Sequence, residues 1–236
     1  MTTVTGPGHR RANDTNLRHA LQLAEYDTIA DRIAADRPGR ILDWGCGWGQ
    51  MTALLRDRGL DVEAFDYRPE AQESGPRPLT RFPEITAYIE NADPVTLPYA
   101  DDGFDAVLSC GVLEHVRSPG ASLAQLRRIL KPGGSLYVYK LPNRRSYLEA
   151  IAKRTGLYYH GAWPDDRVYD LHSAQALLEG AGFTVREARL ANLLPLTVGG
   201  EAVRPAAPAL WRLNQALGRV PGVRVLATNV ELVATA

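Results

Sequence analysis

The sequence lacks the features that mark several large classes of protein. It has only two cysteines, Cys46 and Cys110, in 236 residues, which is too few for a secreted scaffold stapled by disulfides. No run of 18 apolar residues is present and the N-terminus is polar, so we expect neither a membrane span nor a signal peptide. Basic and acidic residues number 27 each, and this zero net charge gives no reason to expect a nucleic-acid partner. These absences favour a cytoplasmic globular protein.

Short apolar runs alternate with amphipathic segments along most of the chain. Seven runs have the length and flanking residues of strands; they cover residues 40–43, 60–66, 85–92, 104–110, 135–140, 183–189 and 225–234. Helical spacing predicts helices at residues 17–35, 51–58, 118–130, 173–180 and 206–220. This alternation predicts an α/β fold, a doubly wound and mostly parallel seven-stranded sheet, with a small cap of helix and loop.

The strongest local signal is the run Asp43-Trp44-Gly45-Cys46-Gly47-Trp48-Gly49 between a predicted strand and a predicted helix. Glycines there let the backbone turn sharply and approach a ligand closely, and a helix N-terminus offers free N–H groups. Asp66 ends the next strand, where a carboxylate can accept two hydrogen bonds from ribose hydroxyls. The pattern indicates a nucleoside ligand, although the same glycines could form a tight turn that binds nothing.

Glycine spacing separates two kinds of nucleoside ligand. The dinucleotide fingerprint is G-x-G-x-x-G, whereas this chain has G-x-G-x-G. The chain also lacks a Tyr-x-x-x-Lys pair, which counts against a nicotinamide-dependent oxidoreductase.

The order of motifs resembles the class I methyltransferases related to those of quinone biosynthesis. Residues 41–49 resemble the first motif of that family, and Ala92-Asp93 resembles the end of its third strand. Residues 110–116, Cys-Gly-Val-Leu-Glu-His-Val, resemble its segment after strand four, and Leu130-Lys131-Pro132-Gly133-Gly134 resembles its late glycine turn. The resemblance covers residues 40–189 and implies S-adenosyl-L-methionine as cofactor.

The resemblance also implies a role for particular residues in holding the cofactor. Gly45, Cys46 and Gly47 would pass the methionine part, and Asp66 would bind the ribose. The remaining positions implied are Asp43 in the first motif, Tyr67, Ala92 and Asp93 near the adenine, and the Cys110 backbone at the sulfonium end. On their own residue type, both cysteines are more readily interpreted as small buried filler.

Histidine is the natural general base for a protonated acceptor near neutral pH. His115 follows the fourth strand, where the acceptor should arrive, although it could equally hold a helix start. His160 lies in an aromatic run, residues 158–163, that could wall an acceptor or simply pack beneath a loop. The spacing of Asp165, Asp166, His160 and His172 matches no metal motif, so no metal is expected.

We expect one methyltransferase domain over residues 1–236. Residues 1–39 would form a helical lid, 40–142 the cofactor-binding core, and 143–171 with 190–224 the insertions that cap the substrate. The leading hypothesis is O-methylation of a small-molecule acceptor in biosynthesis. The stretch 206–220 is amphipathic, so a peripheral-membrane enzyme acting on an isoprenoid or lipid-linked acceptor stays open, as does a non-catalytic S-adenosylmethionine-binding module. The sequence indicates no oligomeric state.

Overall fold

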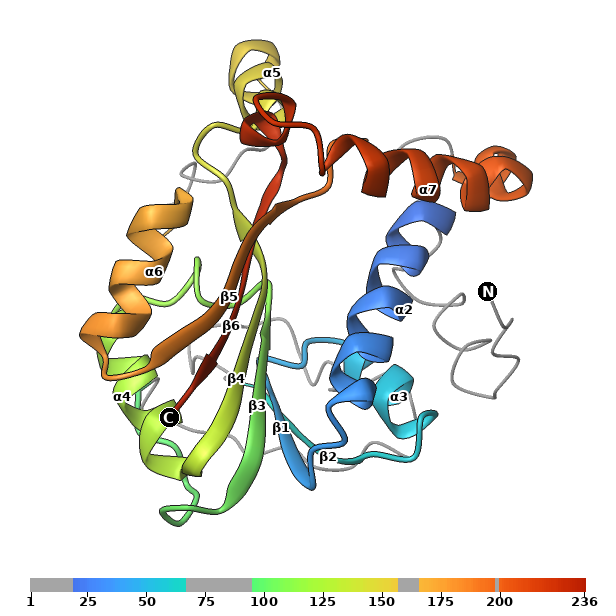
Figure 1. The fold of residues 1–236 in the computed structure, drawn as a ribbon. Coiled ribbons are helices and arrows are strands. Elements are labelled where there is room, and N and C mark those ends of the chain that lie inside the picture. Colours follow the sequence, from blue (N-terminus) through green and yellow to red (C-terminus); the bar gives the residue numbers. More distant parts are fainter. Residues whose placement is uncertain (1–18, 67–94, 157–165, 198–199) are drawn as a thin grey trace, which may run out of the picture.

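A mixed sheet forms the centre of the molecule (Figure 1). The computed structural model describes residues 19–66, 95–156, 166–197 and 200–236. Its strands are β1 (Arg40–Trp44), β2 (Asp61–Phe65), β3 (Phe104–Cys110), β4 (Leu130–Pro142), β5 (Thr184–Ala191) and β6 (Asn229–Thr235). Their order across the sheet is β2-β1-β3-β4-β6-β5.

The pairing confirms the mostly parallel α/β sheet. β1 is parallel to β2 and β3, and β3 is parallel to β4, whereas β6 runs antiparallel to both β4 and β5. The described residues hold six strands, one fewer than the seven predicted, and the predicted strand at residues 85–92 lies outside them. The carboxyl ends of β1 to β4 therefore meet at one edge, where a ligand is expected in such a fold.

Helices cover both faces of the sheet, as a doubly wound fold requires (Figure 1). The described helices are α2 (Ala20–Ala35), α3 (Gln50–Arg56), α4 (Pro119–Ile129), α5 (Tyr147–Thr155), α6 (Leu171–Gly180) and α7 (Ala207–Leu217), with short 3-10 helices η1 (Gly200–Ala206) and η2 (Val223–Leu226). Ile29 and Ile33 pack α2 with α3 on one face, whereas Leu126 and Leu178 pack α4 and α6 on the other. No helix among the described residues is long and apolar enough to cross a membrane.

Several boundaries differ from the prediction for local reasons. α6 begins at Leu171, before the predicted Ser173, because the Asp170 carboxylate accepts a hydrogen bond from the Ser173 N–H at 2.8 Å and caps the helix. β4 begins at Leu130, which pairs with Phe104, so the predicted glycine turn is part of an irregular strand. In the same way, residues 223–226 form η2, and β6 starts only at Asn229.

The two predicted insertions contain helices at the same end of the molecule (Figure 1). α5, which the sequence did not predict, starts at a Ser146 cap and ends at Gly156 with φ +71°. α7 corresponds to the predicted amphipathic stretch and lies beyond the carboxyl end of β5. The second half of α2 is part of the packed core, with Ala30 and Ile33 fully buried.

Candidate functional site

The glycine-rich loop follows β1 at the carboxyl edge of the parallel strands. Gly45 and Gly47 have φ of +77° and +54°, a conformation that glycine adopts without strain. A Cβ on Gly45 would lie 2.4 Å from Cγ2 of Val112, so the loop packs directly on the segment after β3. A Cβ on Gly47 would meet no described atom within 4 Å. Among the described residues, the loop is therefore closed on the Val112 side and open at Gly47.

The end of β2 supports this loop and brings Asp66 to its open side. The N–H groups of Gly45 and Cys46 donate to the Phe65 carbonyl at 2.8 and 2.9 Å. The Gly47 N–H donates to Oδ2 of Asp66 at 2.7 Å. A carboxylate at this position can accept hydrogen bonds from ribose hydroxyls, so the loop and Asp66 together fit a nucleoside.

Asp43 lies beneath the loop rather than on its open side. The side chain is 1% exposed, and its Oδ2 accepts a hydrogen bond from the Thr52 hydroxyl at 2.6 Å. Burial raises the pKa of Asp43 to about 6, against the opposing effect of the Thr52 hydrogen bond. This geometry joins β1 to α3 and fixes the loop between them.

Both cysteines lie beside the loop, Cys46 within it and Cys110 at the end of β3. Burial raises the pKa of both thiols well above the ordinary range, and neither is in a disulfide. A protonated thiol is a poor nucleophile, so their surroundings favour the interpretation as buried filler. Of the remaining predicted site residues, Tyr67, Ala92, Asp93 and His160 lie outside the described residues.

His115 lies in the turn after β3 and forms a pair with an aspartate from the first insertion. Its Nδ1 is 2.8 Å from Oδ1 of Asp166, whose side chain is 4% exposed, while the His115 side chain is 45% exposed. Nε2 lies 3.7 Å from Oε1 of the buried Glu114. An ionised Asp166 only accepts hydrogen bonds, so it favours the tautomer of the imidazole that has its proton on Nδ1.

Arg167 holds Asp166 at this position. The Arg167 N–H donates to the Glu114 carbonyl at 2.9 Å, and its guanidinium donates to the carbonyls of Val116 and Arg117 at 2.8 and 2.9 Å. The sequence alone suggested no pairing of Asp166 with His115, since 51 residues separate them. Among the residues that the structure places, no cluster of three metal-ligating side chains is present.

A second group of polar side chains, centred on Glu25 of α2, was missed by the sequence reasoning. Glu25 is 2% exposed and accepts hydrogen bonds from Nζ of Lys140 at 2.7 Å, from the Asn192 amide at 2.5 Å and from the Asn229 amide at 3.1 Å. Burial by itself would lower the pKa of Lys140, but the Glu25 carboxylate outweighs it and holds that pKa above its ordinary range. The sequence did contain one signal of this group. Glu25 is four residues after Leu21 and four before Ile29, so it lies on the buried face of the helix.

The same group reaches α7 through two asparagines. The Asn214 amide donates to Oδ1 of Asn192 at 3.0 Å, and Oδ1 of Asn214 accepts from the N–H groups of Leu193 and Leu194 at 2.8 and 3.0 Å. Buried hydrogen bonds therefore join the cap helix to the segment that follows β5, and Trp211, which is 6% exposed, packs the helix with Leu21 of α2.

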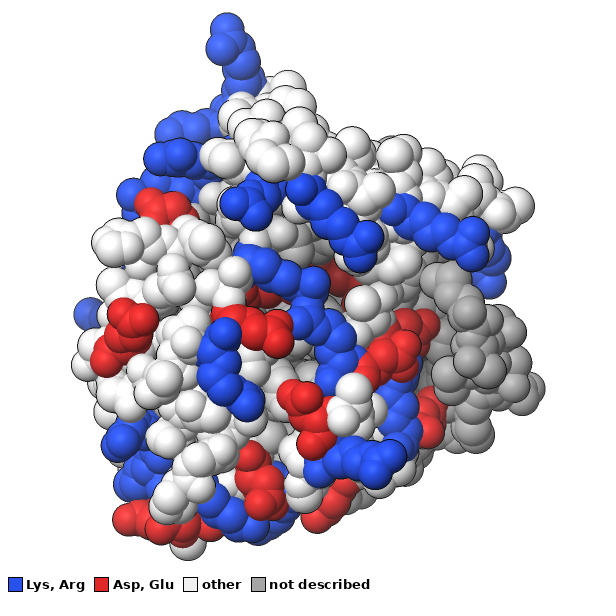
Figure 2. All heavy atoms as spheres, in the orientation of Figure 1, with Lys and Arg blue, Asp and Glu red and all other residues white. Residues whose placement is uncertain are grey.

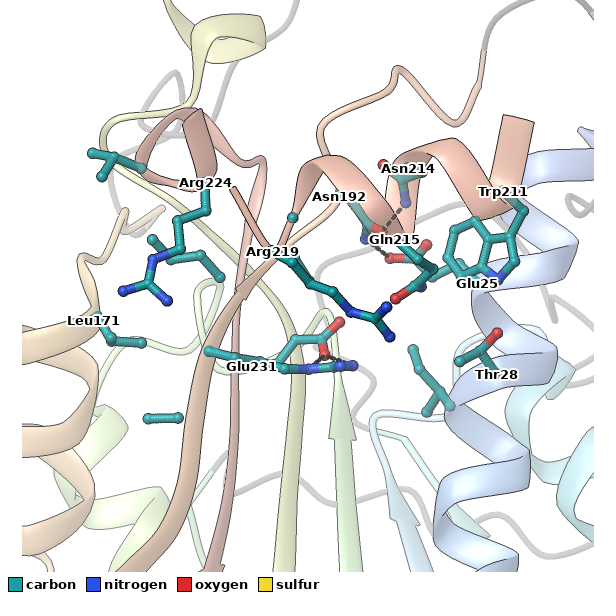
Figure 3. Close-up of a pocket in the computed structure, with 17 residues that line it drawn as sticks. Glu25, Thr28, Leu171, Asn192, Trp211, Asn214, Gln215, Arg219, Arg224 and Glu231 are labelled. Carbon is teal, nitrogen blue, oxygen red and sulfur yellow. Dashed lines mark hydrogen bonds and ion pairs between the residues drawn. The ribbon is translucent and has the colours of Figure 1, made fainter. Parts of the chain in front are cut away.

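A cavity of about 660 Å³ lies beside this group, within the range of small-molecule sites (Figure 3). Its walls come from α2, β5, β6, α7 and η2. Trp211, Asn214 and Gln215 line it from α7, and Figure 3 shows Arg219 reaching in from the end of that helix. None of the described site residues Gly45, Gly47, Asp66, Cys110 and His115 lines this cavity. The two are related only through Glu25, whose partner Lys140 follows Tyr139, the β4 residue that pairs with Cys110.

Comparison with known proteins adds a family to this geometry. A family model described as a methyltransferase domain matches residues 16–188. A demethylmenaquinone methyltransferase of Renibacterium salmoninarum is 33% identical over 159 residues, covering 58% of this chain and 65% of that protein. A ubiquinone biosynthesis O-methyltransferase of Xanthomonas campestris is 32% identical over 136 residues, covering 57% and 55%. The chain thus spans about half to two thirds of the length of these relatives.

Solved structures share the fold over most of the chain. A putative methyltransferase in complex with the Haloferax volcanii Trm112 activator superposes with a TM-score of 0.60 at 17% identity, covering 97% of this chain and 93% of that one. A Burkholderia thailandensis 1,6-didemethyltoxoflavin-N1-methyltransferase with bound S-adenosylhomocysteine gives 0.55 at 20% identity, covering 96% and 82%. At these identities the likeness establishes the fold alone.

Proposed function

The chain belongs to the S-adenosylmethionine-dependent methyltransferases with a Rossmann-like fold, and from that premise we propose that it methylates a small-molecule acceptor on oxygen. The observation that carries the proposal is the cradle of Gly45, Gly47 and Asp66, whose open side and carboxylate fit a nucleoside cofactor. The names of the quinone-biosynthesis relatives support an acceptor of biosynthetic metabolism and, for one of them, an oxygen nucleophile.

The cofactor would be held along the carboxyl edge of the sheet. Residues 45–47 would contact its methionine part and Asp66 its ribose, with the backbone of Cys110 at the sulfonium end; Asp43 would support the loop from below, and Tyr67, Ala92 and Asp93 would complete the adenine site. S-adenosylmethionine supplies, when bound, a methyl group on a sulfonium that is open to direct displacement. The main task of the chain is then to align the acceptor, and such positioning is worth about 7–11 kcal/mol.

His115 is the proposed general base. Asp166 fixes the ring and its tautomer, so Nε2 is available to take the proton of an acceptor hydroxyl. The turn that carries His115 also carries Val112, which packs against Gly45, so the base stands beside the cofactor loop. A positioned base of this kind contributes about 10²–10⁴-fold in rate. His160 remains a second proposed base, from the aromatic run.

The acceptor would bind in the cavity roofed by α7. Its lining combines an aromatic wall at Trp211 with amides at Asn214 and Gln215, the mixture that orients a small ring-shaped molecule. Gln215→Trp should fill the cavity and raise the KM for the acceptor about tenfold or more, with cofactor affinity unchanged. Arg212→Trp, on the exposed side of the same helix, is the matched control.

Calorimetric titration with S-adenosylmethionine and S-adenosylhomocysteine tests the cofactor site. We expect micromolar binding that Asp66→Ala weakens at least tenfold, because the ribose loses its carboxylate partner. Asp61→Ala, at the exposed start of the same strand, should bind as the wild type does. Folded protein that binds neither compound would contradict the proposal and reopen a dinucleotide site, for which reduced nicotinamide is the probe.

Turnover is measured as release of S-adenosylhomocysteine over a panel of hydroxylated aromatic and quinol acceptors. His115→Ala should lower kcat about 100-fold and Asp166→Asn about tenfold, both with cofactor binding intact. His172→Ala, at an exposed histidine of α6, is the control. A loss below tenfold in His115→Ala would remove that residue as the essential base. Cofactor binding without turnover on any acceptor would favour the non-catalytic module.

We place the reaction in the cytoplasm and expect no nucleic-acid acceptor. Two free cysteines, Cys46 buried and Cys110 partly buried, support a reducing compartment. The zero net charge of the chain supports a small molecule over nucleic acid.

A further inference from the structure

The large hydrophobic side chains that the described residues expose all lie in one part of the molecule. They are Ile151 on α5, Leu213 on α7, Val220 after α7, and Val223 and Leu226 on η2. Each is between 39% and 50% exposed. Single exposed apolar residues are normal on any protein, but their confinement to three elements at one end forms a patch of the kind that marks an interaction surface.

The same segments carry a local excess of positive charge. Residues 144–155 and 202–228 contain one carboxylate, Glu149, and eight exposed basic residues: Arg144, Arg145, Lys153, Arg154, Arg204, Arg212, Arg219 and Arg224. Because the chain has 27 residues of each sign, nineteen basic and twenty-six acidic residues remain for the rest. Figure 2 shows basic side chains around an uncharged surface at the end formed by α5 and α7, with acidic side chains gathered lower on the molecule.

Few residues of these helices are buried against the rest of the protein. No residue of α5 is buried. α7 buries Ala207, Trp211 and Asn214, which leaves Leu213 exposed with its neighbour Arg212. In Figure 1, α5, η2 and α7 lie together beyond the carboxyl ends of β4 and β5. Of these elements, α7 and η2 also line the cavity of Figure 3, so their part of the surface adjoins the cavity.

We propose that this cap surface, the exposed residues of segments 144–155 and 202–228, docks on a phospholipid bilayer with anionic headgroups. The basic side chains other than Arg219 and Arg224, which line the cavity, meet lipid phosphates and carboxylates, while the five apolar side chains enter the boundary between headgroups and acyl chains. A second copy of the chain is a poorer occupant, because a two-fold contact would set basic side chains against their own kind. Nucleic acid would satisfy the charges but leave the apolar side chains without a partner.

Docking in this orientation turns the cavity and the cofactor edge toward the bilayer. An acceptor dissolved in the membrane would then reach the cavity without crossing water. This consequence for the acceptor rests on the proposed function, whereas docking itself does not. A failure of vesicle binding would therefore count against docking alone, and a failure of cofactor binding would count against the proposed function alone.

Co-sedimentation of the full chain with vesicles tests the proposal. We expect binding to phosphatidylcholine vesicles with about 30% phosphatidylserine at least tenfold stronger than to phosphatidylcholine alone, with a loss between about 0.05 and 0.5 M salt. Arg154→Gln/Arg212→Gln should weaken binding roughly 25-fold, since each basic residue contributes about fivefold. Ile151→Ser/Leu213→Ser should weaken it about tenfold or more, even at low salt.

The matched control is Arg37→Gln/Arg186→Gln, which removes the same charge near the amino ends of the strands and should bind as the wild type does. Equal binding by the control and the cap variants, or no binding to anionic vesicles, would overturn the proposal. A dimer in solution that Ile151→Ser/Leu213→Ser dissociates, with no vesicle binding, would assign the surface to a second copy instead. Each variant needs only to remain folded, which circular dichroism checks.

Discussion

The chain holds its glycine loop, the proposed cofactor site, and its cap by different means. At β1 and β2, backbone N–H groups of residues 45–47 donate to Phe65 and Asp66, all within about 20 positions. At β4, β5 and β6, hydrogen bonds between buried side chains hold the cap. Glu25 accepts hydrogen bonds from Asn192 and Asn229, which are 167 and 204 positions further along the chain. The loop depends on residues that can adopt its backbone conformation, whereas the cap depends on a charge and its partners meeting from distant segments.

The largest effect should come from the cap side, at Glu25. Glu25→Ala leaves the Lys140 ammonium, whose side chain is only 21% exposed, without its carboxylate and removes the acceptor of two asparagine amides. We expect a loss of about 3–5 kcal/mol in the free energy of unfolding, measured by urea denaturation. Glu179→Ala, at an exposed glutamate of α6, should cost under about 0.5 kcal/mol.

A double variant sharpens this prediction. Glu25→Ala/Lys140→Met removes both charges and should recover part of the loss, since an unpaired buried cation costs more than an absent pair. If the double variant is as unstable as the sum of the single ones, the two side chains act independently, and the contrast between loop and cap loses its basis.

On the cofactor side the largest effect should come from Gly45. Gly45→Ala places a Cβ 2.4 Å from Val112 at φ +77°, so it combines backbone strain with a steric clash. Together, strain and clash should lower the free energy of unfolding by about 3 kcal/mol. The affinity for S-adenosylhomocysteine, measured by calorimetry, should fall at least tenfold. Gly120→Ala is the control, because that glycine lies in α4 and a Cβ there meets nothing within 4 Å. Wild-type binding by Gly45→Ala would show that the loop tolerates a shift and is less exacting than its geometry indicates.

This contrast explains which parts could be predicted from the sequence. The glycine loop and Asp66 were recognised because their geometry is encoded in adjacent residues, glycines before a helix and a carboxylate after a strand. The alternating strands and helices were recognised for the same reason. Glu25 left a detectable trace, a carboxylate on an apolar stripe, but nothing nearby in the sequence named Lys140 or Asn229 as its partners.

The pair of His115 and Asp166 lies between these cases. The position of His115 after β3 was predictable from the motif, whereas Asp166 reaches it only because Arg167 bonds to the carbonyls of Glu114, Val116 and Arg117. Likewise, α6 starts at Leu171 because Asp170 caps it, whereas the spacing of apolar residues predicted a start at residue 173. A helix cap is encoded in neighbouring residues and can be predicted from the sequence. Partners that are distant in the sequence can be identified only once the fold is known.

The smallest of the expected effects concerns Asp43, beneath the loop, and depends on pH. Its pKa is about 6 in the folded protein, against an ordinary value of 3.8. Between these pH values the folded state holds more protons than the unfolded chain, so the free energy of unfolding falls as pH rises from about 4 to about 6. The shift in pKa contributes at most about 3 kcal/mol to the free energy of unfolding at low pH, and this contribution is lost above about pH 6.

Asp43→Asn should abolish this dependence, because the amide oxygen still accepts the Thr52 hydroxyl but does not titrate. The difference in unfolding free energy between Asp43→Asn and the wild type should therefore rise from pH 4 to pH 7, as measured by urea denaturation at each pH. Asp61→Asn, at an exposed carboxylate, should give a constant difference near zero. A constant difference for Asp43→Asn as well would mean that the carboxylate is stabilised in its charged form by the loop above it. Backbone groups of the glycine loop would then stabilise a buried charge, as the side chains around Glu25 do. The loop and the cap would differ only in how much of their stability depends on a buried charge.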